Sequence, residues 1–220
     1  MAQRPRLVLL GKQGAGKGTQ SVHLAAHYGV SHVATGDMFR AQAAQGTAFG
    51  LEAKRYMDAG ELVPDEIVIG VIEECTAPGG PLGEGFVLDG FPRTLYQACE
   101  LDRVLAGAPL ALAIDLEVPT DIVLDRIAGR RVCENCHRTY HVNLPPAREW
   151  VCDTCGGTVR QRDDDTEDAV VRRLELYETE TRPILDYYRA RELLVSVDGV
   201  GEGADVFERL VKVIDENLDL

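Results

Sequence analysis

A glycine-rich segment near the start of the chain carries the residue types that bind phosphate. It reads Gly11-Lys12-Gln13-Gly14-Ala15-Gly16-Lys17-Gly18-Thr19 and follows the apolar run Leu7-Val8-Leu9-Leu10. Glycines allow successive backbone N–H groups to converge on phosphate oxygens, and a helix that begins here adds the positive end of its dipole. Lys17 can then reach the β- and γ-phosphates of a nucleotide. The usual pattern has Ser or Thr directly after the lysine, whereas Gly18 precedes Thr19 here.

A second apolar run, Phe86-Val87-Leu88, ends in Asp89-Gly90. An aspartate at the carboxyl end of a strand beside a phosphate loop can hold Mg²⁺, directly or through water. Alone this signal is weak, because many strands end in an Asp-Gly turn. Together with the glycine-rich segment it predicts a magnesium-nucleotide site.

Arginines form a third group of candidates in a chain whose net charge is −13. They would converge if the segments between them folded over the phosphate loop, and phosphoryl transfer needs such cations for positioning and charge neutralisation. Any one of these arginines alone fits a solvated helix face as well as a binding role. Arg131, and also Arg172, which is not one of the seven, fit a solvated face best. The seven residues are Arg40, Arg93, Arg126, Arg130, Arg131, Arg162 and Arg173.

Four of the six cysteines predict a metal site. They form the pairs Cys133-x-x-Cys136 and Cys152-x-x-Cys155, with fifteen residues between the pairs. Four thiolates close a tetrahedral shell and leave no position for water, so we expect a structural Zn²⁺. A redox pair and an iron site of similar geometry are the alternatives. Either His137 or His141 could substitute for a cysteine ligand, but four cysteines suffice. The isolated Cys75 and Cys99 are expected to be packed thiols.

Composition limits the partners of the chain. The acidic charge opposes non-specific nucleic-acid binding, which needs a surplus of Lys and Arg. No stretch approaches the roughly 20 consecutive apolar residues of a membrane helix. The start of the sequence has no secretory pattern, so we expect a cytoplasmic protein without a nucleic-acid or membrane partner.

Short apolar runs alternate with longer amphipathic segments, a pattern that predicts an α/β domain with a central parallel sheet of five strands flanked by helices. The predicted strands are Arg6–Leu10, Ser31–Ala34, Phe86–Leu88, Leu110–Leu116 and Leu193–Val197. The predicted helices are Gly16–Tyr28, Asp65–Cys75, Leu95–Ala106, Thr120–Ala128, Thr166–Ala190 and Ala204–Glu216. Residues 35–63 contain helical pieces but no convincing strand, and residues 130–165 hold the four paired cysteines, so both segments interrupt the alternation as insertions.

Six motifs in chain order resemble those of the adenylate kinase family, in the branch with a zinc-bearing lid. They are Gly14-Ala15-Gly16-Lys17-Gly18-Thr19-Gln20, Thr35-Gly36-Asp37-Met38-Phe39-Arg40, Asp89-Gly90-Phe91-Pro92-Arg93-Thr94, Asp125-Arg126-Ile127-Ala128-Gly129-Arg130-Arg131, Arg162-Asp163-Asp164-Asp165 and Val171-Arg172-Arg173-Leu174. Tyr140-His141, after the second cysteine, also matches that branch. The resemblance implies the P-loop fold of nucleoside monophosphate kinases and reversible, Mg²⁺-dependent transfer between ATP plus AMP and two ADP, by a monomer.

The resemblance also implies a division of the chain and a role for each matching residue. The core would be residues 1–34, 64–129 and 166–220, with an AMP-binding insertion at 35–63 and a zinc-binding lid at 130–165. Residues matching the ATP site are Gly14, Ala15, Gly16, Lys17, Gly18, Thr19, Arg126, Arg130, Thr139, Tyr140 and Gly201, with Asp89 on Mg²⁺ through water. Residues matching the AMP site are Thr35, Arg40, Glu61, Leu62, Val63, Gly90, Phe91, Pro92, Arg93, Gln97, Arg162 and Arg173. The catalytic set would be Lys17, Arg93, Arg130, Arg162 and Arg173.

Several departures and alternatives remain open. Lys12-Gln13 replaces a small residue and Pro, Asp163 stands where Lys is common, and Gly201 stands where Lys often lies near the adenine. A kinase of the same fold with UMP or CMP as acceptor is the nearest alternative, although Thr35 argues against it, and a GTP donor is another. A regulatory P-loop protein with a zinc ribbon is the most distant alternative.

Overall fold

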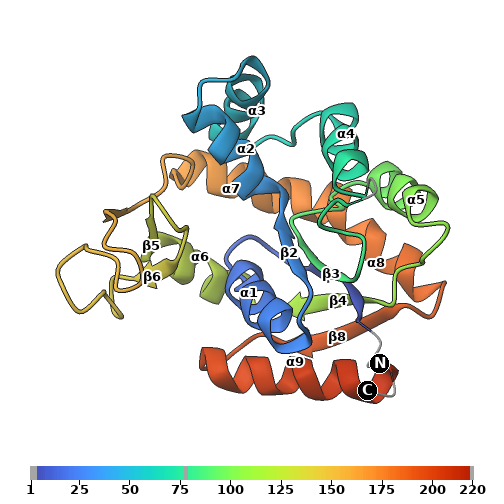
Figure 1. Ribbon diagram of the computed structural model, residues 1–220. Helices are drawn as coiled ribbons and strands as arrows, with labels where there is room; N and C mark the ends of the chain where they lie inside the picture. Colours follow the sequence, from blue (N-terminus) through green and yellow to red (C-terminus); the bar gives the residue numbers. More distant parts are fainter. Residues whose placement is uncertain (1–3, 77–78, 219–220) are drawn as a thin grey trace.

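The computed structural model describes residues 4–76 and 79–218 and has a five-stranded parallel sheet at its centre. The strands lie in the order β2-β3-β1-β4-β8 (Figure 1). Their bounds are Arg6–Leu10 (β1), Ser31–Ala34 (β2), Phe86–Asp89 (β3), Leu112–Glu117 (β4) and Leu194–Asp198 (β8). All five predicted strands are present, with shifts of no more than two residues. Because every pairing is parallel, the carboxyl ends of all five strands meet at one edge.

Alternate residues of each strand face opposite sides of the sheet, and each side has its own apolar core. Val8 and Leu10 of β1 belong to one core, with residues of α4, α5 and α8, whereas Leu7 and Leu9 belong to the other, with residues of α1, α6 and α9. The helices are α1 (Lys17–Tyr28), α4 (Asp65–Thr76), α5 (Leu95–Val104), α6 (Thr120–Ala128), α8 (Arg182–Arg189) and α9 (Gly203–Leu218). This double burial explains why the strands read as continuous apolar runs.

The predicted insertion at residues 35–63 is helical. It contains α2 (Thr35–Ala44) and α3 (Ala48–Asp58), which lie together at the top of Figure 1. Thr47 ends the turn between them, because its hydroxyl accepts a hydrogen bond from Gly50 N at 3.0 Å and caps α3. Gly50 packs so closely on α2 that a Cβ would lie 2.2 Å from the carbonyl carbon of Gln42.

The helix predicted for Thr166–Ala190 is present as one continuous helical segment, residues 167–189, but it contains a π turn that the sequence did not predict. Helix α7 spans Glu167–Leu176, a π-helical turn η1 spans Tyr177–Thr181, and α8 follows. The physical reason is Pro183, which has no N–H for the carbonyl of Thr179 and whose ring clashes with that carbonyl in a regular helix. Arg182 N–H instead donates to Tyr177 O, five residues back.

Residues 130–165 contain a small antiparallel sheet that the sequence did not predict. Its strands are β5 (Arg130–Cys133), β6 (Thr139–His141) and β7 (Val159–Arg160), in the order β6-β5-β7. Its core is a cluster of Cys133, Tyr140, Cys152 and Val159, with Trp150 against it. The lobe is thus poor in apolar residues, as expected, and two of its four buried core residues are cysteines. Across the described ranges, we find no helix long and apolar enough to cross a membrane.

Candidate active site

The glycine-rich segment connects β1 to α1 at the carboxyl edge of the sheet, the context that phosphate binding requires. Gly14 and Gly16 have φ of +82° and +104°. A Cβ on Gly14 would also lie 2.7 Å from Ile127 Cγ1, because α6 packs against the loop. Helix α1 begins with no side-chain cap and no acidic residue in its first turn. Its first backbone N–H groups therefore have no competing side-chain acceptor and suit an anion.

Lys17 folds back over this loop. Its Nζ donates to Gly11 O at 2.7 Å and to Lys12 O at 2.8 Å. Burial, helped by Arg93 and Arg130 and opposed by Asp89, lowers the pKa of Lys17 from 10.5 to about 8. The ammonium is thus held in a desolvated position beside other cations, where a polyanionic ligand would stabilise it.

Asp89 lies at the end of β3, next to β1, and its carboxylate faces the start of α1. A Cβ on Gly18 would lie 3.2 Å from Asp89 Oδ2, closer than most Cβ contacts. This contact gives a local reason for the glycine between Lys17 and Thr19. The structure therefore places Asp89 beside the phosphate loop, which is where the predicted magnesium contact requires it.

Five of the seven predicted arginines meet near the loop, and three aspartates pair with four of them. Arg173 Nη2 donates to Asp164 Oδ2 at 2.6 Å, and Arg40 Nη1 lies 3.8 Å from the same oxygen. Arg130 forms a two-bond pair with Asp165, with Nε to Oδ2 at 2.8 Å. Asp37 pairs with Arg40 at 2.5 Å and with Arg162 at 3.8 Å. The five arginines are Arg40, Arg93, Arg130, Arg162 and Arg173.

Burial and the neighbouring cations lower the pKa values of two of these arginines. Burial, together with the neighbouring Arg173 and Arg40, lowers the pKa of Arg93 to about 10. Burial likewise lowers the pKa of Arg162 to about 10, together with Arg40 and Arg130. Such perturbation beside a phosphate loop is typical of a site that binds a highly charged anion.

The Gly90–Gln97 segment is folded tightly around Arg93. Gly90 has φ of +77°, and a Cβ there would lie 2.9 Å from Arg93 Nη2 and 3.3 Å from Thr35 Oγ1. Its carbonyl accepts from Arg93 Nε at 2.8 Å and from the Thr35 hydroxyl at 3.1 Å. Gln97 Oε1 accepts from Arg93 N at 2.7 Å, and Gln97 Nε2 donates to Asp65 at 2.7 Å. Both ends of the Gln97 amide therefore have protein partners.

The remaining predicted residues lie in different places. Arg126 of α6 contacts the phosphate loop, because its guanidinium donates to Ala15 O and also to Gly199 O, both at 3.1 Å. Arg131 and Arg172 lie apart from the cluster. Arg131 stacks on Trp150 and Arg172 pairs with Glu61. Val63, Phe91 and Pro92 are buried, Thr139 and Gly201 are exposed, and Leu62 is half-buried.

Sequence reasoning missed the three aspartates that hold the arginines. Asp37, Asp164 and Asp165 stand inside motifs already noted, but no local pattern shows which arginine each would meet. Their partners include residues more than 100 positions away, as in the Arg40–Asp164 pair. The only local signal was the acidic run after Arg162.

The four paired cysteines gather in the lobe formed by residues 130–165. All four sulfurs lie within 4.8 Å of one another, with Cys133–Cys155 at 3.4 Å and Cys136–Cys152 at 3.5 Å. Zn–S bonds of about 2.3 Å in a tetrahedron place sulfurs about 3.8 Å apart, so this donor set fits zinc. A disulfide needs about 2 Å. His137 and His141 are not in the cluster, which among the described residues consists of cysteines alone.

Tyr140 supports this cluster from inside the lobe. Its hydroxyl donates to Cys152 Sγ at 3.3 Å and accepts from Asp153 N at 2.9 Å. The hydrogen bond from Tyr140 is the main reason why the pKa of Cys152 falls to about 5. The Tyr140 side chain is therefore directed into the lobe, and its predicted contact with ATP stays a prediction.

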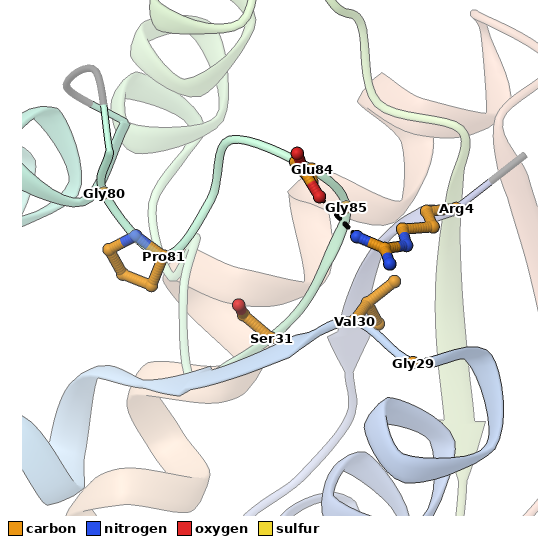
Figure 2. A pocket seen from close by; sticks show the side chains of 8 residues that line it. All are labelled: Arg4, Gly29, Val30, Ser31, Gly80, Pro81, Glu84 and Gly85. Atoms are coloured by element: carbon orange, nitrogen blue, oxygen red, sulfur yellow. Dashed lines mark hydrogen bonds and ion pairs between the residues drawn. The ribbon is translucent and has the colours of Figure 1, made fainter.

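A separate hollow lies at the opposite edge of the sheet (Figure 2). Arg4, Ser31 and Gly85, among the residues that line it, precede or begin β1, β2 and β3 at their amino ends. Figure 2 shows one ion pair there, between Arg4 and Glu84, and both side chains are more than half exposed. Among the described residues that line the hollow, Arg4 and Glu84 are the charged ones, so the charge cluster lies at the other edge, beside the phosphate loop.

A parallel sheet with a phosphate loop after its central strand, and arginines from two insertions beside that loop, defines a phosphotransferase of the nucleoside monophosphate kinase class. A family model described as adenylate kinase matches residues 9–193. The chain is 51% identical to an adenylate kinase of Streptomyces griseus over 95% of this chain and 97% of that protein. It is 46% identical to one of Desulfitobacterium hafniense over 97% and 100%, and 47% identical to one of Acidothermus cellulolyticus over 95% and 97%. The chain belongs to the adenylate kinase family.

Proposed function

We propose that this protein transfers the γ-phosphoryl group of MgATP to AMP, reversibly, to give two ADP. The observation that carries the proposal is the convergence of Arg40, Arg93, Arg130, Arg162 and Arg173 beside the phosphate loop. The acceptor is a phosphate whose second pKa is about 6, so it is largely ionised near neutral pH and needs no general base. Catalysis then depends on positioning and charge neutralisation, which a set of fixed arginines supplies.

The donor would bind on the phosphate loop. Backbone N–H groups from Gly14 to Thr19 would surround its phosphates, and Lys17 would leave the Gly11 and Lys12 carbonyls for phosphate oxygens. Asp89 would hold Mg²⁺ through water, and the ion would neutralise charge on the β- and γ-phosphates. Arg126 and Arg130 would complete the donor side from α6 and β5, with Thr139, Tyr140 and Gly201 as the more distant contacts.

The acceptor would bind between α2 and the Gly90–Gln97 segment. Arg40 and Arg93 would bind its phosphate, and Thr35 and Gln97 would face its base, with Glu61, Leu62 and Val63 along the insertion. Arg162 and Arg173 would bridge the transferring group. Closure of both insertions would exclude water, which would otherwise accept the phosphoryl group.

A panel of acceptors tests this proposal. ADP formation from MgATP is measured with AMP, UMP, CMP and GMP in turn, and then with MgGTP as donor. We expect strong turnover with MgATP and AMP and turnover at least about 100-fold weaker with the pyrimidine acceptors. Preference for UMP or CMP would overturn the substrate assignment, and a lack of transfer to all four would overturn the proposed activity.

We also propose that Cys133, Cys136, Cys152 and Cys155 hold a structural Zn²⁺ that substitutes for the core that the lid lacks. Removing the metal with a chelator should unfold residues 130–165 before the main domain. Calorimetry should then show an added low-temperature transition, and limited proteolysis should cut inside the lid first. Elemental analysis should give about one zinc per chain.

Single cysteine variants supply the control for the zinc proposal. Cys155→Ser should lower the zinc content several-fold, whereas Cys99→Ser, on α5 outside the cluster, should leave it unchanged. Identical calorimetric profiles for the metal-loaded and chelated protein would contradict the proposal. Iron in place of zinc would keep the structural role and correct the metal.

A further inference from the structure

The π-helical turn η1 stands at the junction of several parts of the active site. Its Tyr177 hydroxyl lies beside the Asp115 carboxylate on β4. Glu178 Oε1 lies 3.6 Å from Lys12 Nζ of the phosphate loop. Thr181 Oγ1 donates to the backbone carbonyl of Arg93 at 2.9 Å. Single π turns inside helices are rare and frequently mark functional positions.

The turn changes which side chain faces the sheet. A π turn contains an extra residue relative to an α turn, which rotates the following positions by about 100° around the helix axis. Thr181 is 8% exposed, whereas Glu178, Thr179, Glu180 and Arg182 are exposed. The π turn before Pro183 thus places Thr181, a polar residue, on the buried side of the helix. The buried residue is a threonine, whose hydroxyl has a partner.

That partner is the backbone carbonyl of Arg93. Arg93 donates two hydrogen bonds within its own segment, from Nε to Gly90 O and from its backbone N–H to Gln97 Oε1. The third, at the carbonyl, comes from Thr181, 88 residues further along the chain. Thr181 thus ties the Arg93 segment to the C-terminal helices.

We propose that Thr181 is a positioning residue for Arg93 and that the π turn serves to present its hydroxyl. The inference rests on the proposed function, in which Arg93 binds the acceptor phosphate. Loss of the hydroxyl leaves the Arg93 carbonyl without its partner and frees the segment to shift. Donor binding on the phosphate loop does not depend on this hydrogen bond, so the effect should be confined to the acceptor.

The test compares Thr181→Val, which keeps the shape and removes the hydroxyl, with Thr181→Ser, which keeps the hydroxyl. We expect Thr181→Val to lower kcat/KM for AMP about tenfold, the effect of one lost hydrogen bond, while KM for ATP stays within about twofold. Thr181→Ser should stay within about twofold of the native protein. The control is Thr179→Val on the same turn, because the exposed Thr179 hydroxyl bonds only Glu175 O at 3.2 Å.

A structural readout separates this inference from the proposed activity. Crystal structures of the native protein and the two Thr181 variants should show the Arg93 backbone displaced in Thr181→Val and unmoved in Thr181→Ser. If the native protein fails to phosphorylate AMP, the activity is overturned and this comparison still decides the role of Thr181. Equal kinetics and equal Arg93 positions in both variants would overturn the inference. If Thr181→Val does not fold, Thr181→Ala gives the same comparison with less crowding.

Discussion

Replacing Lys17 by methionine should lower kcat/KM for MgATP by about 10³-fold, the range observed when a preorganised charge is removed from a transition state. Methionine has a similar length and an unbranched stem, so the loop keeps its packing while the ammonium disappears. In the unliganded protein that ammonium bonds only the carbonyls of Gly11 and Lys12. The lowered pKa of Lys17 shows that the fold disfavours its charge, so the variant should unfold within a few degrees of the native protein. Steady-state kinetics and thermal unfolding check both expectations.

The pH profile of the native protein reports on the same ammonium. Lys17 has a pKa of about 8 in the unliganded protein and therefore loses its charge as the pH rises above 8. We expect kcat/KM for MgATP to fall by about tenfold per pH unit above that value, because this parameter follows the free protein. The limiting kcat should persist to higher pH, because bound phosphates favour the charged lysine.

A surface lysine provides the control for both measurements. Lys212→Met lies on α9, where Lys212 is largely exposed and pairs only with Glu216 at 4.0 Å. This variant should keep native kinetics and the native pH profile. A Lys17→Met variant that retains most of its activity, or a native kcat/KM that stays flat to pH 9.5, would contradict the role of Lys17.

The sequence predicts the parts of this molecule that depend on local patterns. The apolar run of β1 gave its bounds without error, because four of its five residues are buried and Gly11 ends the run. The bounds of β2 were also correct. The phosphate loop was equally predictable, because its backbone has positive φ at Gly14 and Gly16, and glycine is the residue that adopts this conformation most readily. The spacing of the four cysteines predicted their cluster for the same reason.

The sequence does not predict features that depend on distant partners. The strands of the lobe at residues 130–165 are two to four residues long and have no apolar alternation, so nothing local marks them. Pro183 was visible inside the predicted helix. The sequence did not show that the π turn beside it would direct the Thr181 hydroxyl to the Arg93 carbonyl. Asp164 and Asp165 are ordinary acidic residues until the chain brings Arg173, Arg40 and Arg130 to them. Contacts between residues far apart in the chain therefore account for the π-turn contact and for two of these three charge pairs, which the sequence did not predict.

Asp164→Asn should lower the free energy of unfolding of the unliganded protein by about 3 kcal/mol, because it leaves the largely buried Arg173 without its carboxylate partner. Its side chain is 7% exposed, and that of its partner Arg173 is 13% exposed. Burial alone would raise the pKa of Asp164, but Arg173, Arg40 and Arg162 lower it below 3.8. A carboxylate with a lowered pKa stabilises the fold above pH 3.8, and this contribution is lost as the pH falls below that value. The difference between native protein and variant should therefore shrink in acid.

Nucleotides should reverse much of this loss. Their phosphates bring negative charge to the same arginines, so AMP with a non-hydrolysable ATP analogue should raise the unfolding temperature more in Asp164→Asn than in the native protein. The control is Asp163→Asn, one residue away, where the carboxylate is 59% exposed and pairs with Arg160 at the surface. That change should stay within about 0.5 kcal/mol. Equal stability of both variants and an equal response to nucleotide would contradict this role of Asp164. The positions of the arginine side chains would then not depend on the Asp164 carboxylate.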